Sequence, residues 1–202
     1  MLQNFANFIV ELVHDWSYGG IFFMMFLESS ALIPFPSEVA MIPAGYLASQ
    51  GKMSVMLAWL AGTAGSLLGA TFNYYICYFF GRGLIDRYGK YVGLNDQKMA
   101  KFEEFFEKHG EISTFNCRLI PGIRQYISLP AGLAKMNFAK FAFFTTLGAG
   151  IWMAILLALG YFLGENMDFV KEQLHIIIIA LLVLVMLSFI VYFLFYRYKK
   201  AK

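Results

Sequence analysis

The sequence predicts an all-α, polytopic membrane protein that forms a single membrane domain over residues 1–202. Three observations lead to this fold class. First, 59% of the 202 residues are hydrophobic and 14% are charged, with a mean hydropathy of +0.61, whereas a soluble domain carries about 25% charged residues. Second, some apolar segments reach the roughly 20 residues that a helix needs to span a bilayer. Third, two other apolar segments are interrupted by prolines. Soluble enzymes and nucleic-acid-binding modules are therefore excluded.

The first part of the chain is predicted to contain an interfacial helix, a broken hairpin and a span. Residues 1–16 place their apolar side chains on one helical face, which is typical of an amphipathic helix at an interface. Residues 17–49 are apolar but interrupted at Pro34 and Pro36. Each limb is too short to cross a hydrocarbon core of about 30 Å, so we expect a re-entrant hairpin. Residues 54–80 are long enough to span the membrane.

The second part of the chain is predicted to repeat this order. Residues 81–113 are polar and are expected to form a cytoplasmic loop that carries a surface helix ending at Gly110. Residues 114–133 are apolar and broken by prolines, which predicts a second re-entrant hairpin. Three further segments complete the prediction, namely a span over 138–163, a last span over 174–196 and a cytoplasmic tail over 197–202.

The distribution of basic residues predicts the orientation. If residues 81–113 and the C-terminus are cytoplasmic, twelve of the sixteen Lys and Arg residues lie on that side and two lie on the other. This asymmetry follows the positive-inside rule and fits a bacterial cytoplasmic membrane. A hairpin followed by a span, repeated once in the opposite orientation, is a common plan among transporters. The side of the N-terminus depends on whether residues 17–49 cross the membrane.

Four charged residues interrupt the apolar hairpins. Glu28 and Glu38 lie in the first hairpin, whereas Arg118 and Arg124 lie in the second. A charge at the bilayer centre costs at least about 2.5–3.5 kcal/mol, so each residue is a candidate functional group. Arginine keeps its charge and offers a fork that matches phosphate, so the two arginines are expected to bind an anionic headgroup. The two glutamates are expected to carry protons.

The same charges have a purely structural interpretation, in which salt bridges fasten the two hairpins together. The functional interpretation adds a polar cavity between the hairpins, because broken backbone at membrane depth must be buried or line a wet cavity. The side chains expected to line this cavity are Ser37, Asn116, Gln125, Tyr126 and Ser128.

Catalytic and metal-binding patterns are weak in this sequence. The three histidines, His14, His109 and His175, lie far apart, and the two cysteines have no metal-ligand spacing. We therefore expect no cofactor and no metal, and an enzyme such as a lipid phosphatase is disfavoured. The interhelical faces are compatible with a monomer or a homo-oligomer.

Two motifs around the four charges resemble those of the DedA family, also described by the SNARE-associated or VTT domain. The first contains Glu28 and the run Pro34-Phe35-Pro36-Ser37-Glu38. The second is the run Asn116-Cys117-Arg118-Leu119-Ile120-Pro121-Gly122-Ile123-Arg124, followed by Pro130-Ala131-Gly132, Met136, Phe141, Gly148 and Trp152. The resemblance covers about residues 20–165. The family often has Gly before an Asp where this chain has Ser37 and Glu38.

This resemblance implies a function in lipid transport. Bacterial members are similar to transporters of undecaprenyl phosphate, and the family is associated with the proton-motive force. The expected function is thus a flippase for an anionic lipid phosphate, most favourably undecaprenyl phosphate, with membrane lipids and protons as partners. The resemblance also implies that Glu28, Glu38, Arg118 and Arg124 are essential. The alternatives are a phosphatidylethanolamine flippase, an uncoupled scramblase, or a small-ion channel or exchanger.

Overall fold

The described part of this computed structural model consists of helices and turns. It covers residues 17–30, 36–92, 96–120 and 122–163, with a few single positions between 176 and 187. The predicted amphipathic helix over 1–16 and the tail over 197–202 lie outside the described residues, as does most of the predicted last span over 174–196. The fold is therefore all-helical over the part of the chain that is described, as the composition predicts.

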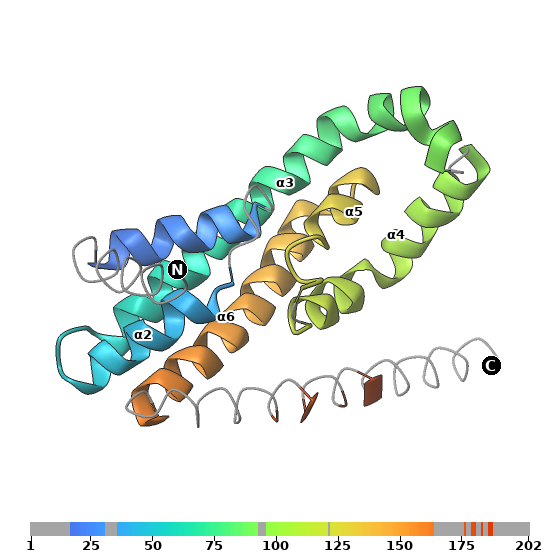
Figure 1. Ribbon diagram of the computed structural model, residues 1–202. Helices are drawn as coiled ribbons and strands as arrows, with labels where there is room; N and C mark the ends of the chain where they lie inside the picture. The colour runs from blue at the N-terminus through green and yellow to red at the C-terminus, as the bar shows by residue number, and fades with distance from the viewer. Residues whose placement is uncertain are drawn as a thin grey trace.

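Six helices follow one another in the described residues. The first covers 17–29 and is followed by α2 (Glu38–Ser49), α3 (Val55–Val92), α4 (Asp96–Arg118), α5 (Ser128–Leu133) and α6 (Phe138–Leu163). The helix over 17–29 and α2 run in opposite directions, so that their outer ends meet at the same end of the molecule (Figure 1). The long helices α3 and α6 also pack together and run in opposite directions (Figure 1).

In each half of the protein, the helix that precedes the chain break packs on the long helix that follows in the same half. The helix over 17–29 lies against α3, where a Cβ at Gly65 would come within 2.2 Å of the Phe22 carbonyl oxygen. The end of α4 lies against α6, where a Cβ at Gly148 would come within 2.6 Å of the Arg118 Cβ. Small residues at such crossings let helix backbones approach closely, as they do between membrane helices.

The helix that follows each chain break, α2 or α5, packs on the long helix of the other half of the protein. Thus α2 lies against α6 through Gly45 and Gly160, and α5 lies against α3 through Gly132. Both α2 and α5 end with the same hydrogen-bond pattern, in which a residue of positive φ, Gly51 or Lys135, closes the helix. The two halves of the protein are therefore built alike and are interlocked.

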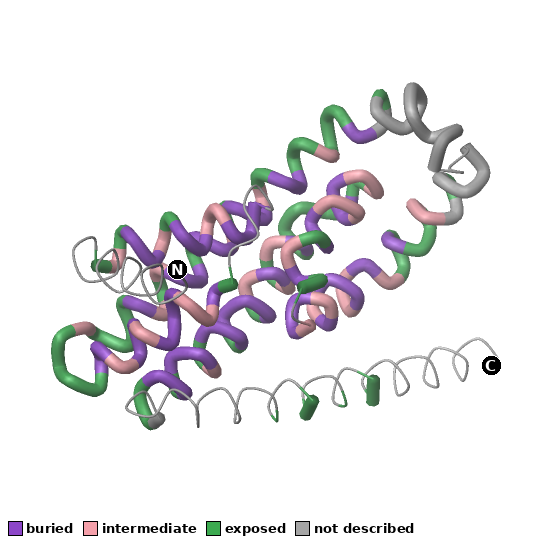
Figure 2. Tube along the Cα trace, in the orientation of Figure 1, coloured by how far each residue is buried: buried purple, intermediate pink, exposed green. Residues whose placement is uncertain are grey.

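The outer surfaces of α3 and α6 are apolar. Segments Val55–Gly81 and Phe138–Phe162 are long and hydrophobic enough to span a membrane. Their inner faces are buried against the other helices, whereas Phe79, Phe80 and Phe162 are 69%, 67% and 77% exposed (Figure 2). A soluble protein rarely exposes so much contiguous apolar surface. The exposed phenylalanines therefore face lipid in a membrane protein.

The helix end predicted at Gly110, within the polar stretch 81–113, is wrong. The long helix α3 continues to Val92, and α4 runs from Asp96 to Arg118 without stopping at Gly110. Gly110 stays inside the helix because it packs closely on Met136, whose sulfur would lie 3.0 Å from a Cβ at this position. The chain reverses only beyond Arg118, where Gly122 has a φ of +80°. The boundary predicted at residue 114 therefore falls inside α4.

The exposed side of α4 remains polar, as the composition of this stretch indicates. Lys108 pairs with Glu104 one turn earlier at 2.6 Å, and this hydrogen bond lowers the pKa of the Glu104 carboxyl. Lys140 at the start of α6 pairs with Glu111 at 2.5 Å. These exposed pairs contribute little to stability.

The close crossing of α2 and α6 gives a first testable prediction. A Cβ at Gly160 would lie 2.0 Å from the Ile42 carbonyl oxygen, so Gly160→Ala must push the two helices apart. We expect the free energy of unfolding in detergent to fall by about 1–3 kcal/mol. The matched control is Gly83→Ala in α3, which meets no atom within 4 Å and should be neutral or slightly stabilising. Equal stability of the two variants would contradict this packing.

Candidate functional site

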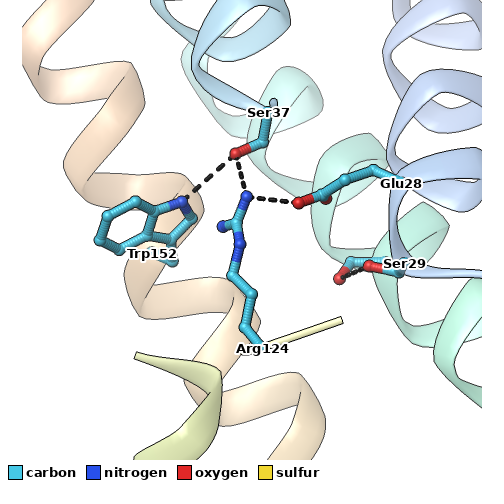
Figure 3. A network of polar contacts seen from close by, with 6 residues as sticks. Glu28, Ser29, Ser37, Arg124 and Trp152 are labelled. Carbon is cyan, nitrogen blue, oxygen red and sulfur yellow. Dashed lines mark hydrogen bonds and ion pairs between the residues drawn. The ribbon is translucent and has the colours of Figure 1, made fainter. Parts of the chain in front are cut away.

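A buried ion pair joins the two broken segments. Glu28 lies near the end of the helix over 17–29, and Arg124 lies in the turn between α4 and α5. Their side chains meet, and the Arg124 guanidinium donates hydrogen bonds to the Glu28 carboxylate and to the Ser37 hydroxyl (Figure 3). Glu28 is 3% exposed and Arg124 is 7% exposed. The expected meeting of charges from the two segments is therefore confirmed for this pair.

Trp152 of α6 packs its ring against the Arg124 guanidinium. The Arg124 guanidinium carbon lies 5.0 Å from the centroid of the Trp152 ring, which is a cation–π distance. The indole Nε1 donates a hydrogen bond of 3.3 Å to the Ser37 hydroxyl (Figure 3). Arg124 is thus held by the first helix, by the residue that precedes α2 and by α6.

Arg118 is the second buried guanidinium. It ends α4, is 2% exposed, and donates a hydrogen bond of 3.0 Å to the hydroxyl of Ser128 at the start of α5. Its Nε is buried, and among the residues that the structure describes it has no hydrogen-bond partner. Gly148 of α6 makes room for this side chain, as its close contact with the Arg118 Cβ shows. A buried, incompletely paired guanidinium is costly, which suggests a role beyond packing.

The three buried charges surround a very small cavity. Its volume is about 10 Å³, and its lining residues are Glu28, Ser29, Ser66, Arg118, Arg124, Ala149 and Met153. This is about the space of one water molecule, so a phosphate group does not fit. The sequence predicted a wet cavity between the hairpins, whereas the structure is closed around the charges. Access to the arginines requires the ion pair to open.

The other predicted site residues divide into two groups. Ser37 and Ser128 are buried and contact Arg124 and Arg118, respectively. Glu38 is partly buried and acts electrostatically on Glu28, but the structure gives it no hydrogen bond or ion pair to either arginine. Tyr126 is 48% exposed and therefore does not line the closed cavity.

Two amides among the predicted residues do not line the cavity. Asn116 is buried in α4, two residues before this helix ends at Arg118. Gln125 is partly buried beside Arg124, and it is likewise not a lining residue. Of the turn residues 122–127, only Arg124 lines the cavity.

Three residues of the site were not predicted as such. They are Trp152, which appears in the sequence motif without a role, Ser66 and Asn73. In the structure the Ser29 and Ser66 hydroxyls lie 2.6 Å apart, and Asn73 donates a 3.1 Å hydrogen bond to the Ser29 carbonyl. These bonds fasten the end of the first helix to α3. An asparagine within an apolar span was the available signal for this contact.

Metal ligands are not gathered in the part of the chain that is described, where no group of three or more His, Cys, Asp or Glu side chains lies together.

Comparison with known proteins identifies the family. The model of the VTT domain matches residues 35–162, which is more than half of the chain. The chain belongs to the VTT-domain, or DedA, family. Within the matched range lie Ser37, Arg118, Arg124 and Trp152, whereas Glu28 precedes it. No solved structure matches the chain significantly.

Three relatives of this VTT-domain protein carry different names. The uncharacterized membrane protein YkoX of Bacillus subtilis is 34% identical over 95% of this chain and 88% of its own length. An alkaline phosphatase-like protein of Lactococcus lactis is 33% identical over 91% of this chain and 90% of its own. Undecaprenyl phosphate transporter A of Bacillus subtilis is 33% identical over 81% of this chain and 80% of its own. The relatives are thus membrane proteins, and one is named for transport.

Proposed function

We propose that the chain is a proton-coupled transporter that moves a lipid phosphate across the bacterial cytoplasmic membrane, with undecaprenyl phosphate as the first candidate. The observation that carries the proposal is the pair of buried arginines at the cavity, one of which has an Nε without a hydrogen-bond partner among the described residues. The names of two relatives as undecaprenyl phosphate transporter A support the choice of substrate.

Both arginines suit a phosphate better than any neutral headgroup. In the part of the chain that the structure describes, the Nε of Arg118 has no acceptor, and one nitrogen of Arg124 donates to both Glu28 and Ser37. A phosphate offers several acceptor oxygens and negative charge, so it can replace the carboxylate at Arg124 and fill the vacant donor of Arg118. Because the two arginines are deeply buried, little water screens their attraction to a phosphate, which strengthens these contacts.

The ion pair supplies a coupling step. While Glu28 is ionised, it holds Arg124 and competes with the phosphate. Protonation of Glu28 removes the negative charge, which frees Arg124 for the substrate. Loss of that proton restores the pair and expels the phosphate. In this proposal Glu38, which acts on Glu28 electrostatically, passes the proton to or from it.

The lipid tail stays outside this polar centre. An apolar groove of about 450 Å³ runs along the outer side of α3 beside the first helix. Phe26, two residues before Glu28, lines this groove together with Phe72, Tyr75 and Phe79. The groove gives an isoprenoid chain a path close to the headgroup site.

Transport of labelled undecaprenyl phosphate in liposomes tests this function. Wild-type protein is expected to move the lipid between leaflets when a pH gradient is applied, and Arg118→Ala is expected to abolish the movement. The matched control is Lys140→Ala, which removes a charge from an exposed pair and should move lipid normally. No movement by folded wild-type protein would contradict this substrate.

The same vesicles distinguish the alternative functions. Movement that does not depend on the gradient would indicate a scramblase, and movement of phosphatidylethanolamine alone would indicate a different headgroup. Ion flux without lipid movement would indicate a channel or exchanger. Release of inorganic phosphate would favour the activity implied by the name of the Lactococcus relative.

A further inference from the structure

The Ser37 hydroxyl is a shared acceptor in the closed site. It receives hydrogen bonds from the Arg124 guanidinium and from the Trp152 indole. Both of these groups can only donate, so the hydroxyl oxygen must accept both bonds at once. The indole ring also covers the guanidinium at 5.0 Å. Trp152 therefore contacts Arg124 twice, once directly and once through Ser37.

All of these contacts stabilise Arg124 in one place, against Glu28. Trp152 is fully buried on α6, and Ser37 directly precedes α2, so the two contacts also join these helices at the site. If the Arg124 side chain turns towards another anion, it loses its contacts with the Trp152 ring and the Ser37 hydroxyl. Any contact that is made only in the closed form lowers the population of the open form.

We propose that Trp152 is a positioning residue that latches the site, holding Arg124 on Glu28 until the substrate phosphate replaces the carboxylate. This inference rests on the proposed function and adds its regulation. The latch sets the fraction of molecules that are open, and the apparent dissociation constant equals the intrinsic one divided by that fraction. Weakening the latch therefore raises the open fraction and tightens binding of a phosphate.

A cysteine in the cavity measures opening without any substrate. Ala149 lines the cavity and is 4% exposed, so Ala149→Cys places a thiol where a water-soluble maleimide reaches it only in the open form. The native Cys77 and Cys117 are first replaced by serine. In this full-length background we expect Trp152→Phe to raise the labelling rate about three- to tenfold, because phenylalanine loses the N–H and binds a cation less strongly.

A second tryptophan provides a matched control. Trp59 of α3 donates a 2.8 Å hydrogen bond from its Nε1 to the carbonyl of Gly150, which lies in α6 as Trp152 does. Trp59 does not line the cavity. Trp59→Phe therefore removes the same kind of bond and should leave the labelling rate unchanged. Ser37→Ala, which removes the shared acceptor, should raise the rate as Trp152→Phe does. An unchanged rate in Trp152→Phe, or an equal rise in Trp59→Phe, would overturn the latch.

A binding measurement distinguishes failure of the latch from failure of the proposed function. We would titrate farnesyl phosphate, a short isoprenoid phosphate, into the same proteins and follow the heat released. The dissociation constant is expected to fall about three- to tenfold in Trp152→Phe, and a rise in that constant would overturn the latch. If wild-type protein binds farnesol as tightly as farnesyl phosphate, the proposed function fails, whereas the latch still stands or falls with the labelling rate.

Discussion

Arg124→Ala is expected to lower the free energy of unfolding by about 3–5 kcal/mol, because it leaves the Glu28 carboxylate buried without its partner. Transport should be lost in the same variant. The stability is measured by denaturant unfolding in detergent, and transport by leaflet exchange in liposomes. A loss of transport in this variant alone does not separate a substrate site from a structural salt bridge.

A double variant that removes both charges distinguishes a substrate site from a structural salt bridge. The double variant Glu28→Gln with Arg124→Met removes both charges and keeps most of the side-chain volume. We expect most of the lost stability to return, since replacing both members of a buried ion pair is often neutral. Transport should stay absent, because the phosphate has lost a ligand and the proton its carrier. Recovered transport in the double variant would show that these charges only fasten the two segments together.

Arg118→Met is expected to separate stability from function still further. Within the described ranges Arg118 has no ion-pair partner and its Nε has no hydrogen-bond partner, so an apolar side chain of similar length should leave stability unchanged or raise it. Transport should fall at least about a hundredfold, since two bonds from a buried charge to a phosphate contribute about 3 kcal/mol or more. Stability that falls by several kcal/mol, with normal transport per folded molecule, would assign Arg118 a structural role.

The two apolar spans and the separation of two helices around the prolines are predicted from the sequence because they depend on length, composition and proline. The predicted spans over 54–80 and 138–163 agree within a residue with Val55–Gly81 and Phe138–Phe162. A run of about 20 apolar residues has few alternatives in a membrane protein. The interruption at Pro34 and Pro36 likewise separates the helix over 17–29 from α2.

Other features depend on tertiary contacts, which spacing does not reveal. Gly110 was expected to end a helix, but contact with Met136 keeps it inside α4. Arg124 pairs with Glu28, and the sequence positions of Glu28 and Glu38 do not reveal which acid forms the pair. Trp152 looks like an ordinary residue of an apolar span, and only its neighbours Ser37 and Arg124 give it a polar role.

The most direct test of the account is whether the buried arginines recognise phosphate. Native mass spectrometry of the full chain compares its binding of undecaprenyl phosphate with that of undecaprenol, which has the same tail and no charge. We expect wild-type protein to prefer the phosphate at least about tenfold, as one charge-assisted contact implies. We expect Arg118→Met to lose most of this preference, with Arg124 retaining the remainder, while Lys140→Met keeps it. Equal binding by wild-type protein, or an undiminished preference in Arg118→Met, would contradict the account.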